Sequence, residues 1–171
     1  MYLSLVWKAV INEVMQMRNI IEHEEFYELV NKYLINKPAV LAYSSAAEYR
    51  ELAYCEYIEK IEVYVEDFLP ELNELKFKQI KIDSFDGIDY AEDGKGIKCC
   101  SSEQVIYDLL QRDYEKTVRG EYYIAEETIQ AIEVYSIYNK SSFSKLKFSN
   151  DEIKKLFEEY LKILQERDNY D

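Results

Sequence analysis

The chain has 171 residues, enough to bury a hydrophobic core, and 48% of them are hydrophobic, which argues against intrinsic disorder. Only four glycines and two prolines are present, too few for the many tight turns of an all-β sandwich or barrel. The net charge of −13 repels nucleic-acid phosphates and anionic membranes, so we expect neither direct nucleic-acid binding nor membrane binding.

The first predicted helix spans residues 3–21, where apolar residues recur every three or four positions. Lys8, Glu13 and Arg18 interrupt the apolar residues, and no small-residue cleavage site follows. Neither a secretory signal nor a membrane span is therefore expected.

Cysteine usage indicates the cellular compartment. The chain has three cysteines, two of them adjacent, which is not the pattern of a disulfide framework. We therefore expect a protein of the reducing cytoplasm.

Two further helices follow. Helical spacing marks residues 24–35, and Pro38 ends this helix because the residue before a proline is pushed out of the helical region. Ser45, with Glu48 three positions later, forms a capping-box signature, so a long helix is expected over 45–69.

One part of that long helix has a rival interpretation. Residues 61–65 (Ile-Glu-Val-Tyr-Val) also alternate with a period of two, as a strand would. A helix is preferred, because helical positions precede this segment and Pro70 stops the helix after it.

Residues 75–100 show a different pattern. Apolar and basic residues alternate over 75–82, which suits a half-exposed strand, and Asp86-Gly87 and Asp93-Gly94 are turn pairs. A second short strand is expected at 96–99. The segment is therefore interpreted as a β-hairpin.

Three more helices are expected, at residues 102–119, 122–138 and 150–167. Ser101 and Ser149 begin capping-box signatures before the first and the last of them. The predicted fold class is therefore mainly α. It is a single helical domain over residues 1–171, with about six helices and one small β-hairpin near residues 75–100.

The sequence offers little catalytic chemistry. Its one histidine, His23, lies among glutamates between two predicted helices and is interpreted as a solvated linker residue. Neither a nucleophile motif nor a phosphate-binding or paired-ligand zinc motif is present. An EF-hand frame on the acidic loop 83–94 fails, because Ala91 and Cys100 fall where ligands are needed. We expect no enzyme activity, no metal and no cofactor.

The negative charge is concentrated in two stretches. Residues 38–74 hold nine acidic and two basic residues, and residues 101–140 hold eight acidic and four basic residues. On a helix over 45–69, five glutamates would share an arc of about 80° and a ridge of about 27 Å. These are Glu48, Glu51, Glu59, Glu62 and Glu66.

An acidic ridge edged by apolar and aromatic residues such as Tyr49 suits a protein-binding surface, with charge for attraction and tyrosine for contact energy. We therefore expect a non-catalytic, acidic inhibitor with a basic protein partner. The leading hypothesis is an immunity protein that neutralises a cognate bacterial toxin, such as a nuclease, by covering its basic surface. Two alternatives stay open: a phage DNA mimic or other anti-defence protein, and a small enzyme that uses dispersed carboxylates.

Overall fold

The structure is a computed structural model that describes residues 20–55, 58–73, 75–121, 125–140, 142–148 and 150–168. Within these residues, six α-helices accompany a five-stranded mixed sheet, so the fold is α/β. The prediction of a mainly α fold with one small hairpin is wrong. Nearly all of the helix predicted at 3–21 lies outside the described residues.

The sheet has the strand order β3-β2-β1-β5-β4. Strand β1 pairs antiparallel with β2 and parallel with β5, while β3 pairs parallel with β2, and β4 pairs antiparallel with β5. The strands are β1 (Ala39–Leu41), β2 (Ile61–Val65), β3 (Phe77–Lys81), β4 (Tyr90–Glu92) and β5 (Lys98–Cys100).

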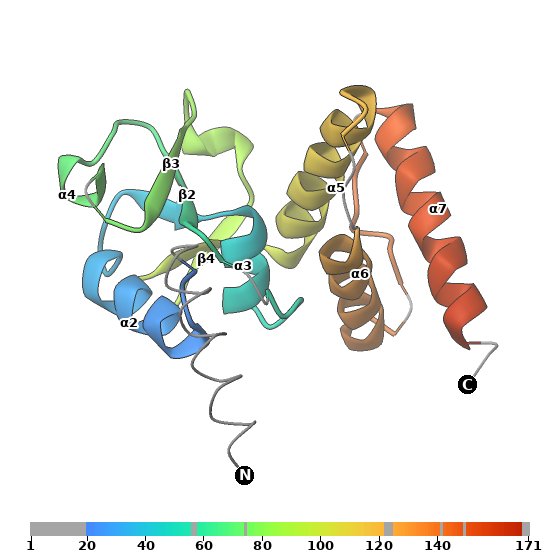
Figure 1. Cartoon of the computed structure of the whole chain (residues 1–171), viewed down its shortest axis with the longest axis horizontal. Coiled ribbons are helices and arrows are strands. Elements are labelled where there is room, and N and C mark those ends of the chain that lie inside the picture. Colours follow the sequence, from blue (N-terminus) through green and yellow to red (C-terminus); the bar gives the residue numbers. More distant parts are fainter. Residues whose placement is uncertain are drawn as a thin grey trace, which may run out of the picture.

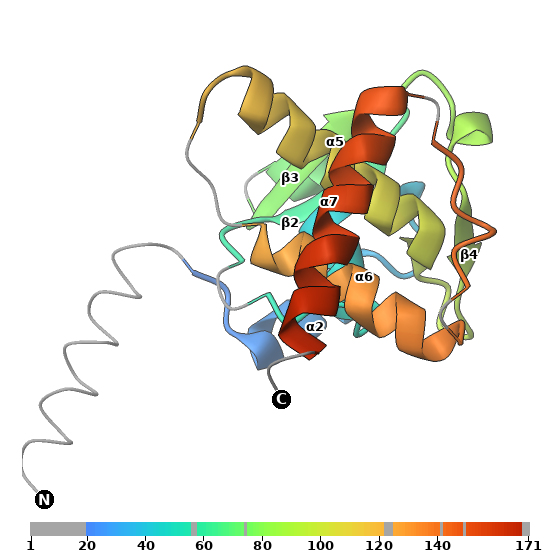
Figure 2. The same cartoon turned by 90° about the vertical axis from the view of Figure 1, so that its right-hand side faces the viewer.

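The helices form two groups (Figure 1). The shorter ones lie around the sheet, and the long ones α5, α6 and α7 stand together beside it, with α7 outermost (Figure 2). The helices are α2 (His23–Tyr33), α3 (Tyr43–Tyr49), α4 (Pro70–Asn73), α5 (Ser102–Val118), α6 (Glu126–Tyr138) and α7 (Asp151–Asp168). A 3₁₀ turn, η1, covers Phe85–Gly87. Among the described residues, no helix is long and apolar enough to cross a membrane.

The helix predicted at 45–69 does not exist. Helix α3 ends at Tyr49, and the segment 61–65 is the strand β2, as its period of two also indicated. Ser45 is not an N-cap: it is buried inside α3, and its Oγ accepts a hydrogen bond from the Glu62 backbone N–H at 2.8 Å. Pro70 begins α4 instead of ending a helix.

The predicted hairpin is wrong in its pairing. Strand β3 pairs with β2, which gives it a parallel neighbour, and the hairpin joins β4 to β5 through the turn at Asp93-Gly94. The helices predicted at 24–35, 102–119 and 150–167 are confirmed to within a few residues as α2, α5 and α7. Ser101 caps α5 as expected, since its side chain accepts from the Gln104 N–H.

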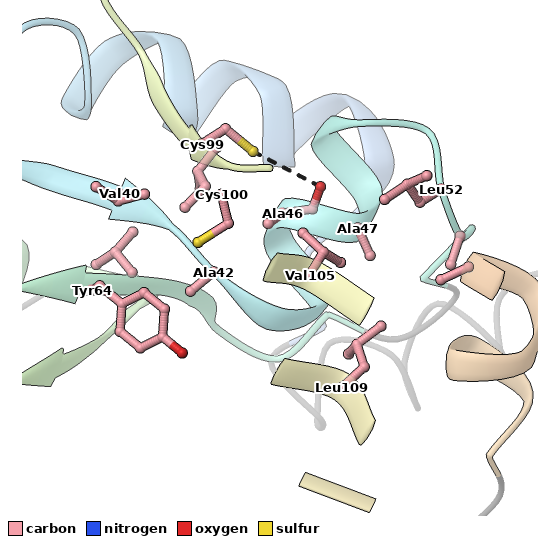
Figure 3. Packing of buried hydrophobic residues seen from close by; sticks show 14 of the residues in the cluster. Val40, Ala42, Ala46, Ala47, Leu52, Tyr64, Cys99, Cys100, Val105 and Leu109 are labelled. Atoms are coloured by element: carbon pink, nitrogen blue, oxygen red, sulfur yellow. Dashed lines mark hydrogen bonds between the residues drawn. The ribbon is translucent and has the colours of Figure 1, made fainter. Parts of the chain in front are cut away.

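The hydrophobic core lies between the sheet and the helices packed on it (Figure 3). Strand β1 is buried at all three positions, and Val105 and Leu109 of α5 pack near Ala46 and Ala47 of α3. This packing fixes the end of α3 against the sheet, and the candidate site forms at that end.

Candidate functional site

A groove with a volume of about 620 Å³ opens where α2 begins, α3 ends and α6 passes by. We call it the tyrosine groove, because three tyrosines line it: Tyr27 from α2, Tyr49 from the last turn of α3, and Tyr54 from the loop after α3. Polar groups lie among these rings. They are His23, Glu48, Glu51, Lys95 and Gln130.

The end of α3 gives the groove its mouth. The Leu52 N–H bonds the Ala47 carbonyl at 2.9 Å, and the Glu51 N–H bonds the Glu48 carbonyl at 3.0 Å. These two bonds form a Schellman motif, whose left-handed position usually carries glycine. Here Glu51 occupies it, with φ at 56°. The turn buries Leu52 and leaves Glu51 exposed at the groove.

His23 and Glu48 form the floor of the site. His23 Nδ1 lies 2.6 Å from Glu48 Oε1, and the Glu48 side chain is only 4% exposed. The other carboxylate oxygen accepts from the Cys55 N–H at 2.8 Å, so both oxygens of Glu48 have a partner. The His23 ring contacts Tyr27 edge-on and lies near Tyr54. His23 is exposed, as expected, but it is not a linker residue: it is the first residue of α2 and pairs with a buried carboxylate.

Tyr49 links α3 to the β4–β5 turn. Its hydroxyl donates to Asp93 Oδ2 at 2.5 Å, while Asp93 Oδ1 accepts from the backbone N–H groups of Lys95 and Ile97. The Tyr49 hydrogen bond lowers the pKa of Asp93. Burial and this bond raise the pKa of Tyr49. The tyrosine therefore stays protonated and fixed, and it holds the turn beside the groove.

The nucleophiles near the groove are not activated. Cys55 Sγ lies 3.2 Å from Glu127 Oε1, and burial, with this carboxylate, raises the pKa of the thiol. The Ser44 hydroxyl accepts from Arg112 at 2.7 Å. A buried carboxylate can orient a histidine for base catalysis. Cys55, held as a thiol, offers His23 no thiolate to activate.

The six residues predicted for partner binding separate into three places. Glu48, Tyr49 and Glu51 line the tyrosine groove, although Glu48 is buried. Glu59 and Glu62 line a second, polar pocket of about 430 Å³, where Lys78 Nζ pairs with Glu62 at 2.9 Å. Glu66 is exposed after β2 and accepts from the Phe85 N–H. The single ridge disappears, because the helix it required is absent.

Sequence reasoning missed the groove residues that come from other elements. Tyr27, Lys95 and Gln130 are brought in by α2, the β4–β5 turn and α6. The Gln130 side chain accepts from the Tyr54 N–H at 3.1 Å, which ties the loop to α6. The high tyrosine content was the available signal, but it does not say which tyrosines meet.

An exposed apolar stripe adjoins the groove. Tyr54 is 63% exposed, and on α6 the groove residue Val134 is followed by Ile137 and Tyr138, which are 71% and 72% exposed. On a helix these α6 positions share one face with Gln130. Exposed aromatic and aliphatic side chains that are contiguous with a groove are typical of protein interaction surfaces.

In the part of the chain that the structure describes, no group of three His, Cys, Asp or Glu side chains is placed to hold a metal ion. Cys55, Cys99 and Cys100 are free thiols. In comparisons with protein-family models, curated proteins and solved structures, nothing matches the chain. A functional proposal therefore depends on the geometry of the groove.

Proposed function

We propose that the chain is a non-catalytic inhibitor that binds a basic protein partner in the cytoplasm. The partner is a bacterial toxin, such as a nuclease, and the chain acts as its immunity protein. The observation that carries the proposal is the tyrosine groove, which combines three aromatic rings with the carboxylate of Glu51.

The chemistry of the groove suits an arginine or lysine side chain of the partner. A cation over a tyrosine ring gains about 0.5–2 kcal/mol, more when water is excluded. The Glu51 carboxylate has no hydrogen-bond or ion-pair partner among the described residues, so it is available to such a cation. Tyrosine is also one of the residues that contribute most to binding energy at protein interfaces.

The charge of the whole chain adds attraction over distance. Exposed carboxylates outside the groove include Glu59 and Glu66, and the net charge is −13. A basic surface that has evolved to hold nucleic-acid phosphates would be attracted to such a protein and would bind it at an increased rate. Glu59 and Glu66 thus keep a role in attraction, without direct contact.

Two substitutions in the groove test the proposal. Tyr54→Ala removes an exposed ring, and Glu51→Lys reverses the charge at the mouth. Candidate partners are the basic proteins encoded by adjacent genes, co-expressed with the chain in a growth assay. We expect the native chain to restore growth, and each variant to weaken binding by roughly 2 kcal/mol, about thirtyfold in Kd, measured by calorimetry.

The control is Glu158→Lys on the exposed side of α7, which changes the net charge as Glu51→Lys does. It should retain nearly all of the affinity. Equal losses for Glu51→Lys and Glu158→Lys would show that only net charge matters and that the groove is not the contact.

A further inference from the structure

The sheet has one open edge and one covered edge. At the covered edge, the Gln79 side chain of β3 bonds both the N–H and the carbonyl of Leu69, just before α4. At the other edge, β4 pairs only with β5, and within the described residues no strand lies on its outer side. An edge of this kind presents backbone groups that another chain can pair with.

The register shows which backbone groups face outward. The Ser101 N–H bonds the Asp89 carbonyl, and the Asp93 N–H bonds the Ile97 carbonyl at 2.9 Å. In an antiparallel pair these hydrogen-bonded positions alternate, so Asp89, Ala91 and Asp93 direct their backbone groups toward β5. Tyr90 and Glu92 therefore direct an N–H and a carbonyl each toward the outer edge.

The chain segment that carries this edge is acidic, although Lys145 and Lys147 share a pocket with Asp89 just before β4. Residues 82–94 contain five acidic residues and no basic one. Asp93 is used in the turn, but the other four carboxylates are exposed and accept no hydrogen bond from the described residues: Asp83, Asp86, Asp89 and Glu92. Lys98 stands opposite Glu92 on β5 and offsets part of this charge. Two such edges would repel each other, which disfavours pairing with a second copy of the chain.

The edge also leads into the tyrosine groove. Asp93 directly follows β4 and accepts a hydrogen bond from the Tyr49 hydroxyl, and Lys95 of the same turn lines the groove. A strand added along β4 would therefore end beside the turn whose Lys95 lines the groove. One continuous surface then serves backbone pairing on the edge and side-chain anchoring in the groove.

We propose that β4 receives an extended, lysine- or arginine-rich segment of the partner as a sixth strand of the sheet. The proposal rests on the function proposed above and names the binding mode. Backbone hydrogen bonds to Tyr90 and Glu92 supply the pairing, and alternate basic side chains meet the acidic residues around the edge.

The first test leaves the protein unchanged and uses a short peptide that alternates lysine and valine. Hydrogen exchange of the backbone amides is followed by NMR. We expect the peptide to slow exchange at Tyr90 and Glu92, with little change at Ala91, which already faces β5. The same peptide with N-methyl groups on alternate residues should lose this effect, because it cannot donate along one edge.

Two results would overturn the strand addition: no slowing at Tyr90 and Glu92 up to millimolar peptide, or equal binding of the N-methylated peptide. A third is a dimer of the chain alone, seen by sedimentation, that pairs through these same two amides. In that case the occupant of the edge is a second copy.

Substitutions test the same edge with the protein partner. Glu92→Pro removes an outward N–H and leaves the bonds to β5, and prolines are tolerated on edge strands. We expect it to weaken partner binding about tenfold or more, and Glu92→Gln, which keeps the N–H, to weaken it less. If Tyr54→Ala weakens binding as expected while Glu92→Pro leaves the affinity unchanged, the strand addition is wrong and the proposed function stands. If neither variant matters, the proposed function fails.

Discussion

Glu51 occupies a left-handed backbone conformation at a helix terminus where glycine is the usual residue. A β-carbon in that conformation costs about 1 kcal/mol or more. Residues held in such strained conformations cluster at functional sites. Glu51 also lines the tyrosine groove, so the strain and the proposed contact coincide at one residue.

Glu51→Gly separates stability from binding. Glycine relieves the left-handed strain, so the free energy of unfolding in urea should rise by about 1 kcal/mol, or stay level if chain entropy offsets it. Affinity for the partner should fall, because the carboxylate is lost. A variant that is both less stable and equally tight in binding would contradict this role for Glu51.

At the residue scale, the sequence predicted part of the site. Tyr49 and Glu51 were predicted for a binding surface and line the candidate groove, whereas Glu48, predicted on the same surface, is buried. The pairing of His23 with Glu48 was missed because the two residues are 25 positions apart, and no local pattern connects them. A contact that arises only from folding cannot be read from spacing along the chain.

At the scale of elements, the predictions failed where tertiary contacts override local signals. Ser45 with Glu48 looks like a capping box, yet the fold uses the Ser45 hydroxyl to bind the N–H of Glu62 on β2. Strand β1 has only three residues, too few for a period to be seen. Long helices such as α5 and α7 were predicted well, because their apolar spacing repeats over several turns.

Helix α5 carries a buried acid that makes stability depend on pH. Asp108 is 4% exposed; its Oδ1 accepts from Gln104 Nε2 at 2.8 Å, and its carboxyl group also interacts with the side chain of Tyr64. Burial raises the pKa of Asp108 to about 6. The native state therefore holds this proton more tightly than the unfolded chain does. The resulting stability is complete below about pH 4 and is lost as the pH rises through 6.

Asp108→Asn tests that assignment. The neutral amide avoids burying a charge, so the variant should be more stable than the native chain by roughly 2–3 kcal/mol at about pH 7. At about pH 4 the two should be nearly equal. Urea unfolding at both pH values measures the difference in free energy of unfolding. A difference that does not change with pH would contradict the raised pKa of Asp108.

At the scale of the whole molecule, composition predicted acidity and the presence of helices, but it did not predict the sheet. The sequence placed the acidic side chains on one helical ridge. In the structure, those glutamates lie in the tyrosine groove, in the polar pocket beside Lys78, and after β2, while the open edge at β4 carries other acidic residues. The expected attraction to a basic partner therefore depends on the summed electrostatic field of the chain. The proposed direct contact with that partner depends on the tyrosine groove.

The most direct test is the association rate constant of the chain with the proposed basic partner, measured by stopped flow across ionic strength. At about 0.5 M salt, the attraction between exposed charges is screened beyond a few ångströms. We expect the native association rate to fall steeply, by about tenfold or more. Tyr54→Ala should leave that rate nearly unchanged and speed dissociation instead. An association rate that is insensitive to salt, or a dissociation rate that Tyr54→Ala does not alter, would contradict binding through the acidic tyrosine groove.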